Sequence, residues 1–240
     1  MASREIEYKL NKFSINYSIL NPNQTKDLII LHGWGSNKDI MIGAFKNYLQ
    51  DFRHIYIDMP GFGKSPNQTI LKTEDYANII DIFLQNISAQ KDSIIGHSFG
   101  GKVATLMQPK LLILLSSAGI KVPKPLSIRI KIAIFKLLKP FGFANIYKLF
   151  ASKDVKGMSQ EMYETFKNVV DEDFREHFQN FPNRALIFWG KEDTATPLSS
   201  GKKIDSLIKN SHFFPLDGDH YFFIKNADFI QTQINKATDE

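Results

Sequence analysis

The chain of 240 residues contains no cysteine, and this absence excludes several kinds of chemistry. Without thiols the protein can form no disulfide framework, no thiolate metal site and no cysteine nucleophile. The lack of cysteine suits a reducing compartment. The charged stretch at residues 1–7 also lacks the apolar core of a signal peptide. We therefore expect a cytoplasmic protein.

Long apolar runs are missing as well, since none approaches the length of a membrane span. No block of lysine and arginine with interleaved aromatic residues marks a nucleic-acid surface, although the net charge is +5. The sequence has neither a metal-ligand spacing such as H-E-x-x-H nor a G-x-G-x-x-G loop after the first parallel strand. We expect no nucleic-acid partner, no metal and no cofactor.

What the sequence does contain is a repeated alternation of short apolar strands with helical segments. Residues 4–20 alternate imperfectly and predict an antiparallel hairpin, with Asn11-Lys12 between its strands. Further strands are predicted at 27–31, 53–58, 94–95, 111–115, 184–190 and 212–216, with helices at 38–50, 73–86, 102–107, 198–209 and 221–236. This rhythm predicts an α/β fold in one domain, 1–240, with a mostly parallel central sheet and helices on both faces.

The strand–helix rhythm stops between residues 120 and 182, where prolines separate helical stretches at 127–139 and 160–168. This segment is too short for a core of its own, so it predicts an inserted helical lid. Residues 121–153 carry eight lysines and arginines and no acid. Either an apolar helix face covers the pocket while the charges face solvent, or the lid attracts an acidic partner. Such a partner is an acyl carrier protein, a carboxylate-bearing substrate or an anionic membrane surface.

The most informative stretch is 94–101, which reads IIGHSFGG and contains the pattern G-x-S-x-G. Apolar strand residues precede it and a helix-forming segment follows. This context predicts a sharp strand-to-helix turn that lifts the side chain of Ser98 clear of the sheet. Small residues are needed there because strand and helix approach closely and the backbone is strained. Ser98 is therefore the candidate nucleophile.

A serine hydroxyl reacts only when a base takes its proton, and the base needs a carboxylate to orient it. Asp193 follows the predicted strand at 184–190, and His220 follows the last one. Their order after Ser98 is the order expected for this kind of turn. Other carboxylates lie close in sequence and stay open as alternatives: Glu192, Asp217 and Asp219.

Five motifs together make the chain resemble the serine hydrolases of the α/β-hydrolase fold. They are HGWG at 32–35, DMPGFGKS at 58–65, GHSFGG at 96–101, GKED at 190–193 with Pro197, and GDH at 218–220. The resemblance implies that Ser98 is the nucleophile, Asp193 the acid and His220 the base. It also implies that the backbone N–H groups of Trp34 and Phe99 form an oxyanion hole.

Within this family the chain is similar to carboxylesterases, and it shares the HGWG loop and compact size with the pimeloyl-carrier-protein methyl esterases. The resemblance implies hydrolysis of a carboxylic ester or thioester through an acyl-enzyme, on a small acyl substrate that is acidic or linked to a carrier protein. The carbon–carbon hydrolases of meta-cleavage pathways share the triad and a lid, but their usual Ser-Gly-Pro-Gly oxyanion loop is absent here. A non-catalytic ligand-binding member of the fold is a further alternative.

Three other residues receive predictions of their own. His97, beside the nucleophile, is expected to line the pocket and bind substrate, with a structural role as the alternative. Ser65 is expected to touch substrate. His32 is expected to order its loop by hydrogen bonds and not to act as a base.

Overall fold

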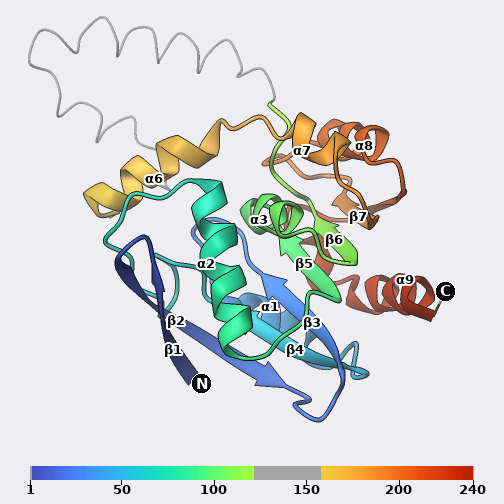
Figure 1. Cartoon of the computed structure of the whole chain (residues 1–240). Helices are drawn as coiled ribbons and strands as arrows, with labels where there is room; N and C mark the ends of the chain where they lie inside the picture. The colour runs from blue at the N-terminus through green and yellow to red at the C-terminus, as the bar shows by residue number, and fades with distance from the viewer. Residues whose placement is uncertain (1, 122–157, 240) are drawn as a thin grey trace, which may run out of the picture.

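The computed structural model describes residues 2–121 and 158–239, and in this part of the chain eight strands form one sheet (Figure 1). The strand order is β1-β2-β4-β3-β5-β6-β7-β8. From β4 to β8 all neighbours are parallel, whereas β1 and β2 run antiparallel. The bounds are β1 Ala2–Tyr8, β2 Asn11–Leu20, β3 Lys26–Leu31, β4 Phe52–Ile57, β5 Ser93–His97, β6 Leu111–Leu115, β7 Arg184–Gly190 and β8 Ser211–Leu216.

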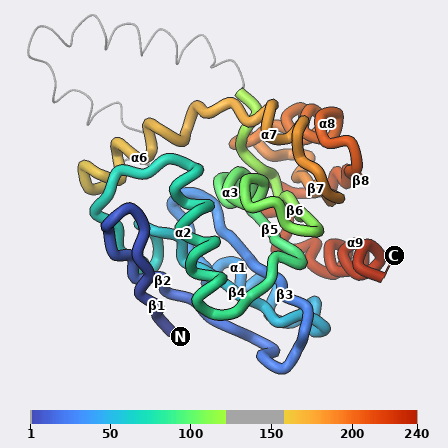
Figure 2. Tube along the Cα trace, in the orientation of Figure 1, coloured from blue at the N-terminus to red at the C-terminus, as the bar shows by residue number. Residues whose placement is uncertain are grey.

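Helices cover both faces of the sheet, because the parallel strands are apolar on both sides (Figure 1 and Figure 2). In β3, Ile29 and Leu31 belong to one core cluster, and Leu28 and Ile30 belong to the other. The first cluster is covered by α2 (Thr73–Asn86), α3 (Phe99–Met107) and α8 (Leu198–Leu207), the second by α1 (Lys38–Phe45) and α9 (Ala227–Asp239). The predicted arrangement of sheet, hairpin and helices is confirmed.

The turn of the hairpin lies earlier than predicted. Lys9 and Leu10 form it, with φ angles of +48° and +63°, and Asn11 already pairs with Tyr8 as the first residue of β2. The apolar alternation of residues 4–20 includes Leu10, but in the structure its side chain is 92% exposed at the tip of the hairpin. A two-residue loop with two left-handed residues matches the twist of the strands and overrides that pattern.

Two helices differ most in extent from the predicted ranges. Helix α1 was expected to reach residue 50 but ends at Phe45, and Leu49 adopts a φ of +54° before β4 begins. The terminal helix α9 begins at Ala227 and not at 221, because Phe222–Ile224 form a separate 3₁₀ turn, η4, that buries Phe222 and Phe223. Burial of these two rings against the sheet takes precedence over helix propensity.

Part of the predicted lid can be described. Between β6 and β7 the structure has α6 (Gln160–Val170) and α7 (Arg175–Gln179). The helix predicted at 127–139, like most of the basic stretch, lies outside the described residues, so the lid remains a prediction. Within residues 2–121 and 158–239, no helix is long and apolar enough to cross a membrane.

Close approach of α3 to the sheet positions the turn at Ser98. A Cβ atom on Gly96 would lie 2.5 Å from the carbonyl oxygen of Gly100, and one on Gly100 would lie 2.6 Å from that of His32. Neither distance is compatible with a side chain. The two glycines therefore let the start of α3 rest directly on the carboxyl ends of β5 and β3.

Candidate active site

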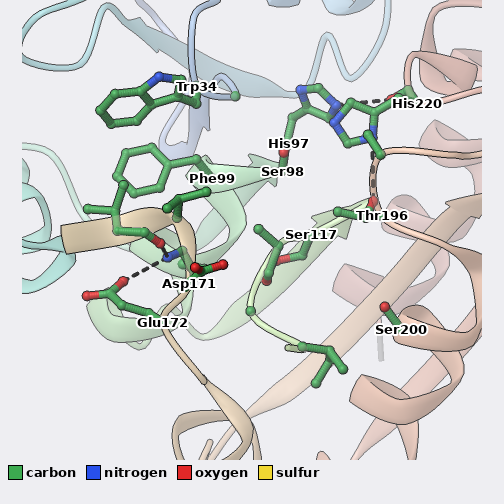
Figure 3. Close-up of a pocket in the computed structure, with 18 of the residues that line it drawn as sticks. Trp34, His97, Ser98, Phe99, Ser117, Asp171, Glu172, Thr196, Ser200 and His220 are labelled. Atoms are coloured by element: carbon green, nitrogen blue, oxygen red, sulfur yellow. Dashed lines mark hydrogen bonds and ion pairs between the residues drawn. The ribbon is translucent and has the colours of Figure 1, made fainter. Parts of the chain in front are cut away.

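The carboxyl ends of the parallel strands open onto a cavity of about 430 Å³ (Figure 3). Most of the residues singled out from the sequence line it: Trp34, His97, Ser98, Phe99 and His220. Their elements are far apart in the chain, since the loop after β3, the turn after β5 and the loop after β8 meet only at this edge. The location is the one expected for ligand binding in a parallel sheet.

Ser98 occupies the sharp turn that joins β5 to α3. Its backbone has φ +51° and ψ −113°, a conformation that non-glycine residues rarely adopt. Two hydrogen bonds hold it there: the Ser98 N–H donates to the Leu115 carbonyl at 3.0 Å, and the Ala118 N–H donates to the Ser98 carbonyl at 3.0 Å. The end of β6 and the loop that follows it thus fix the strained residue.

His220 lies against Asp193, and the two residues follow the neighbouring strands β8 and β7. The distance from His220 Nδ1 to Asp193 Oδ2 is 2.7 Å. Among the described residues the Ser98 hydroxyl makes no hydrogen bond to the His220 ring. Ser98 and His220 both line the cavity, however, and Figure 3 shows them at the same end of it. Rotation about the single χ1 torsion of Ser98 redirects its hydroxyl.

The other carboxylates that the sequence left open have different partners. Asp217 Oδ1 accepts a hydrogen bond from Lys191 Nζ at 2.6 Å, and Glu192 accepts one from the N–H of Gly218. Asp193 is the carboxylate that the structure brings to His220.

Several donors converge on Asp193, which is 5% exposed. Oδ1 accepts the N–H groups of Ala195 and Thr196 at 2.8 and 2.9 Å, and Oδ2 accepts the Thr196 hydroxyl at 2.9 Å as well as His220. Burial by itself raises the pKa of Asp193, but the hydrogen bonds from His220, Thr196 and Ser116 outweigh it and lower the pKa to about 2. The carboxylate is therefore charged at neutral pH.

Thr196 was not identified from the sequence. Its hydroxyl lies 3.1 Å from the Ser116 carbonyl and 3.4 Å from His220 Nδ1, in addition to its contact with Asp193. A threonine three residues after an aspartate is too common to stand out. Only the turn that follows β7 reveals that it supports the carboxylate.

The backbone of the loop after β3 passes close to Ser98. A Cβ atom on Gly33 would lie 2.9 Å from His97 Nδ1 and 3.2 Å from Ser98 Cβ, so a larger residue would force these side chains to shift. Among the backbone hydrogen bonds of the described residues, none uses the N–H of Trp34 or of Phe99. Both donors are available beside Ser98, and that of Phe99 is at the positive N-terminal end of α3.

His32 holds the peptide between Gly33 and Trp34. The Met59 N–H donates to its Nε2 at 3.1 Å, so Nδ1 carries the proton and donates to the Gly33 carbonyl at 2.8 Å. The Ser36 N–H donates to the same carbonyl at 3.2 Å. Since the peptide is trans, the Trp34 N–H points the opposite way. Burial lowers the pKa of His32 to about 4, which keeps it neutral and agrees with a loop-ordering role.

His97 is also buried, at 1% exposure, with its Nε2 3.0 Å from the backbone carbonyl oxygen of His220. The two imidazole rings are 4.6 Å apart between centroids. Burial, followed by the nearby charge of His220, lowers the pKa of His97 to about 3. Its Nδ1 has no hydrogen-bond partner in the described part of the chain. His97 therefore combines a place in the cavity wall with support of the His220 backbone.

Ser65 does not join these residues. It is 1% exposed, its hydroxyl donates to the Asp58 carbonyl at 2.7 Å, and its oxygen accepts the Asn16 N–H at 2.8 Å. It does not line the cavity beside Ser98. Its hydrogen bonds tie the turn after β4 to β2, and we do not propose a substrate contact for it.

Three buried histidines, His32, His54 and His97, predict loss of stability in mild acid. Burial lowers the pKa of His54 as it does for the other two. The pKa values of His32 and His97 are lowered from 6.5 to about 4 and about 3, so between these values and 6.5 the unfolded chain binds more protons than the folded one. The free energy of unfolding should therefore fall as the pH decreases from 6.5, by up to about 1.4 kcal/mol per pH unit for each residue. The pKa of Asp193 is lowered from 3.8 to about 2, so its own contribution to the slope begins only as the pH falls towards 3.8.

Urea unfolding at pH 7, 6 and 5 measures this slope. A His97→Gln variant should show a shallower slope, because one of the three buried histidines no longer takes part in the proton balance. The exposed His212→Gln variant is the matched control and should keep it. Equal stability of the unmodified protein at pH 7 and pH 5 would show that the buried histidines are not held neutral.

Comparison with known proteins shows which folds and relatives this chain resembles. The model of the alpha/beta hydrolase fold family matches residues 27–110. A pimeloyl-acyl-carrier-protein methyl ester esterase of Pseudoalteromonas atlantica is 34% identical over 98 residues, which cover 38% of this chain and only 37% of that relative. The enzyme of the same name from Vibrio cholerae is 25% identical over 90% of this chain and 95% of its own length.

Among solved structures, an esterase from Exiguobacterium antarcticum superposes with a TM-score of 0.74 at 20% identity. The superposition covers 95% of this chain and 96% of the esterase. At this identity the likeness concerns the fold.

Proposed function

This chain has the α/β-hydrolase fold, as its resemblance to that family predicted, and from this premise we propose that it is a serine esterase. It would cleave a carboxylic ester through an acyl-enzyme. One observation carries the proposal: a serine in a strained turn shares a cavity with an imidazole whose other nitrogen lies 2.7 Å from a buried carboxylate. A protein that only binds ligands has no need for all three groups.

In the proposed first step, His220 takes the proton of Ser98 as its oxygen attacks the acyl carbonyl. The charged Asp193 accepts the Nδ1–H of His220, which leaves Nε2 unprotonated and able to act as the base. As the imidazolium forms, the same carboxylate stabilises it. His220 then protonates the departing alcohol, and water releases the acyl group by the same route.

The proposed oxyanion hole consists of the N–H groups of Trp34 and Phe99. Neither has a backbone partner among the described residues, and His32 fixes the direction of the first through the Gly33 carbonyl. The start of α3 adds the positive end of a helix dipole. Each donor of this kind contributes about 3 kcal/mol to the stabilisation of a tetrahedral intermediate.

For the substrate we propose a methyl or other small ester of an acyl group attached to a carrier protein. The support comes from the names of the relatives that match the chain and from charge. Acyl carrier proteins are acidic, whereas this chain has a net charge of +5 and an acid-free basic stretch at 121–153. Complementary charge accelerates encounter and favours the matching partner.

A substrate panel tests the activity and its class. It contains p-nitrophenyl butyrate, an acyl thioester, a carrier-linked acyl methyl ester, the same methyl ester free, and a meta-cleavage dienoate. We expect hydrolysis of the esters, with the carrier-linked ester preferred at low salt. The blank is the Ser98→Ala variant. Turnover of the dienoate alone would replace the proposal with carbon–carbon hydrolysis, and no turnover of any member would favour a non-catalytic binder.

A further inference from the structure

An ion pair with a buried lysine borders the cavity one helical turn beyond Ser98. Lys102 is on α3, four residues after Ser98 and hence on the same helix face, and its side chain is 3% exposed. Its Nζ donates to Glu172 Oε2 at 2.7 Å and to the Val169 carbonyl at 2.5 Å (Figure 3). Lysine is rarely buried unless it is paired, so this placement requires an explanation.

The contacts of Lys102 connect three helices. Val169 lies in the last turn of α6, where carbonyl groups lack partners within the helix, so the ammonium caps α6 at the negative end of its dipole. Glu172 follows α6 and also accepts a hydrogen bond from the hydroxyl of Thr73, the first residue of α2. One charged group on α3 thus fastens the end of α6 to α2 and α3.

Aromatic rings enclose the same ammonium. Lys102 Nζ is 5.5 Å from the centre of the Phe99 ring and 5.0 Å from that of Phe174. Both contacts have cation–π geometry. Phe99 follows the nucleophile directly, and the Phe174 N–H donates to the Gly119 carbonyl at 2.8 Å. Burial lowers the pKa of Lys102, and the carboxylate of Glu172 opposes that change.

Helix α6 supplies an apolar wall to the cavity through Phe166, Val169 and Val170. The Phe166 ring lies 5.3 Å from the Trp34 ring between centroids. This wall therefore stands beside the proposed oxyanion loop, where a bound acyl chain would run.

The body of α6 is attached to the protein by neutral hydrogen bonds. The Leu71 N–H donates to the Thr165 hydroxyl at 3.0 Å, and Asn168 Nδ2 donates to the Leu71 carbonyl at 3.2 Å. Lys102 adds the charged attachment at the C-terminal end, next to Val169 and Val170. That end carries Val169 and Val170, which line the same cavity as Ser98.

We propose that Lys102 is a positioning residue that determines acyl-chain length. By holding the end of α6 it fixes the apolar wall and thereby limits the length of the acyl chain that the site accepts. The inference rests on the esterase activity proposed above, because chain length is defined there by the acyl group on Ser98.

The test is a Lys102→Met variant, which removes the charge and the hydrogen bonds but keeps an unbranched apolar side chain of similar size. We expect the ratio of kcat/KM for p-nitrophenyl octanoate to kcat/KM for the butyrate to rise at least about fivefold, mainly through a lower KM for the octanoate. The reason is that each methylene group admitted to an apolar pocket contributes about this factor or more. Glu172→Gln should shift the ratio in the same direction by less. In the double variant the two effects should not add, because the residues share one interaction.

Lys167→Met is the matched control, since this α6 lysine pairs with Glu164 but is half exposed. Its ratio should equal that of the unmodified protein. A general loss of stability in Lys102→Met would lower both rates together, so an unchanged ratio overturns the inference even if activity falls. If the unmodified protein hydrolyses no ester, the proposed function fails. In that case the affinities of the octanoate and butyrate esters are measured on Ser98→Ala with and without Lys102→Met. A relative gain in octanoate affinity with Lys102→Met supports the role of Lys102, and an unchanged ratio of affinities overturns it.

Discussion

Replacement of Ser98 by alanine should reduce kcat for p-nitrophenyl butyrate by about 10⁵- to 10⁶-fold, the loss seen when a serine nucleophile is removed from such a triad. Without the hydroxyl no acyl-enzyme forms, and His220 has no proton to take. Steady-state hydrolysis at pH 7.5 measures the loss. The proposed oxyanion donors are backbone groups and remain in the variant, so a weak residual rate above that of water is expected.

Ser200→Ala is the matched control for this experiment. Ser200 lines the same cavity and is 3% exposed, but it is not in the strained turn. The control should keep its rate within about threefold, as do most substitutions without a charged or catalytic role. Circular dichroism should show both variants folded. Full activity in Ser98→Ala would mean that another group performs the attack.

The second large effect is expected for Asp193→Asn, with kcat reduced by about 10⁴-fold. An asparagine amide can donate to His220 Nδ1, and this stabilises the tautomer in which Nε2 carries the proton and cannot act as a base. The contacts of Oδ1 with the N–H groups of Ala195 and Thr196 can be kept by the amide oxygen, so the fold should survive. The measurement is again steady-state ester hydrolysis.

Glu192→Gln tests whether the effect is specific to Asp193 or follows from the loss of any nearby carboxylate. Glu192 is adjacent in sequence, but it accepts the Gly218 N–H and not His220. We expect nearly unchanged kcat for this variant. The reverse outcome, a small effect at Asp193 and a large one at Glu192, would mean that the wrong carboxylate has been assigned.

Much of the candidate site could be predicted because its signals are local. The glycines around Ser98 indicate a turn that no larger residue permits, because a Cβ atom on Gly96 or Gly100 would lie 2.5 to 2.6 Å from a backbone oxygen. Asp193 and His220 each follow an apolar strand, and parallel strands end at one edge of a sheet. Strand periodicity and chain order place the three residues at this edge of the sheet, where the structure pairs Asp193 with His220.

What could not be predicted depends on long-range packing. The burial of Lys102 results from the position of Glu172, 70 residues later, and of the last turn of α6. In the sequence Lys102 is one lysine among many. The supporting role of Thr196 and the protonation of His32 on Nδ1 depend in the same way on partners that follow other strands. Ser65 shows that membership of a motif does not place a side chain in the cavity: its hydroxyl joins Asp58 to Asn16, and it does not line the cavity beside Ser98.

The most direct test of the central claim is covalent labelling with a fluorophosphonate, followed by peptide mapping. If Ser98 is activated by His220, the unmodified protein gains one adduct, mapped to Ser98, and His220→Ala labels far more slowly. No adduct under conditions that label a control esterase, or an adduct on a different residue, would contradict the account.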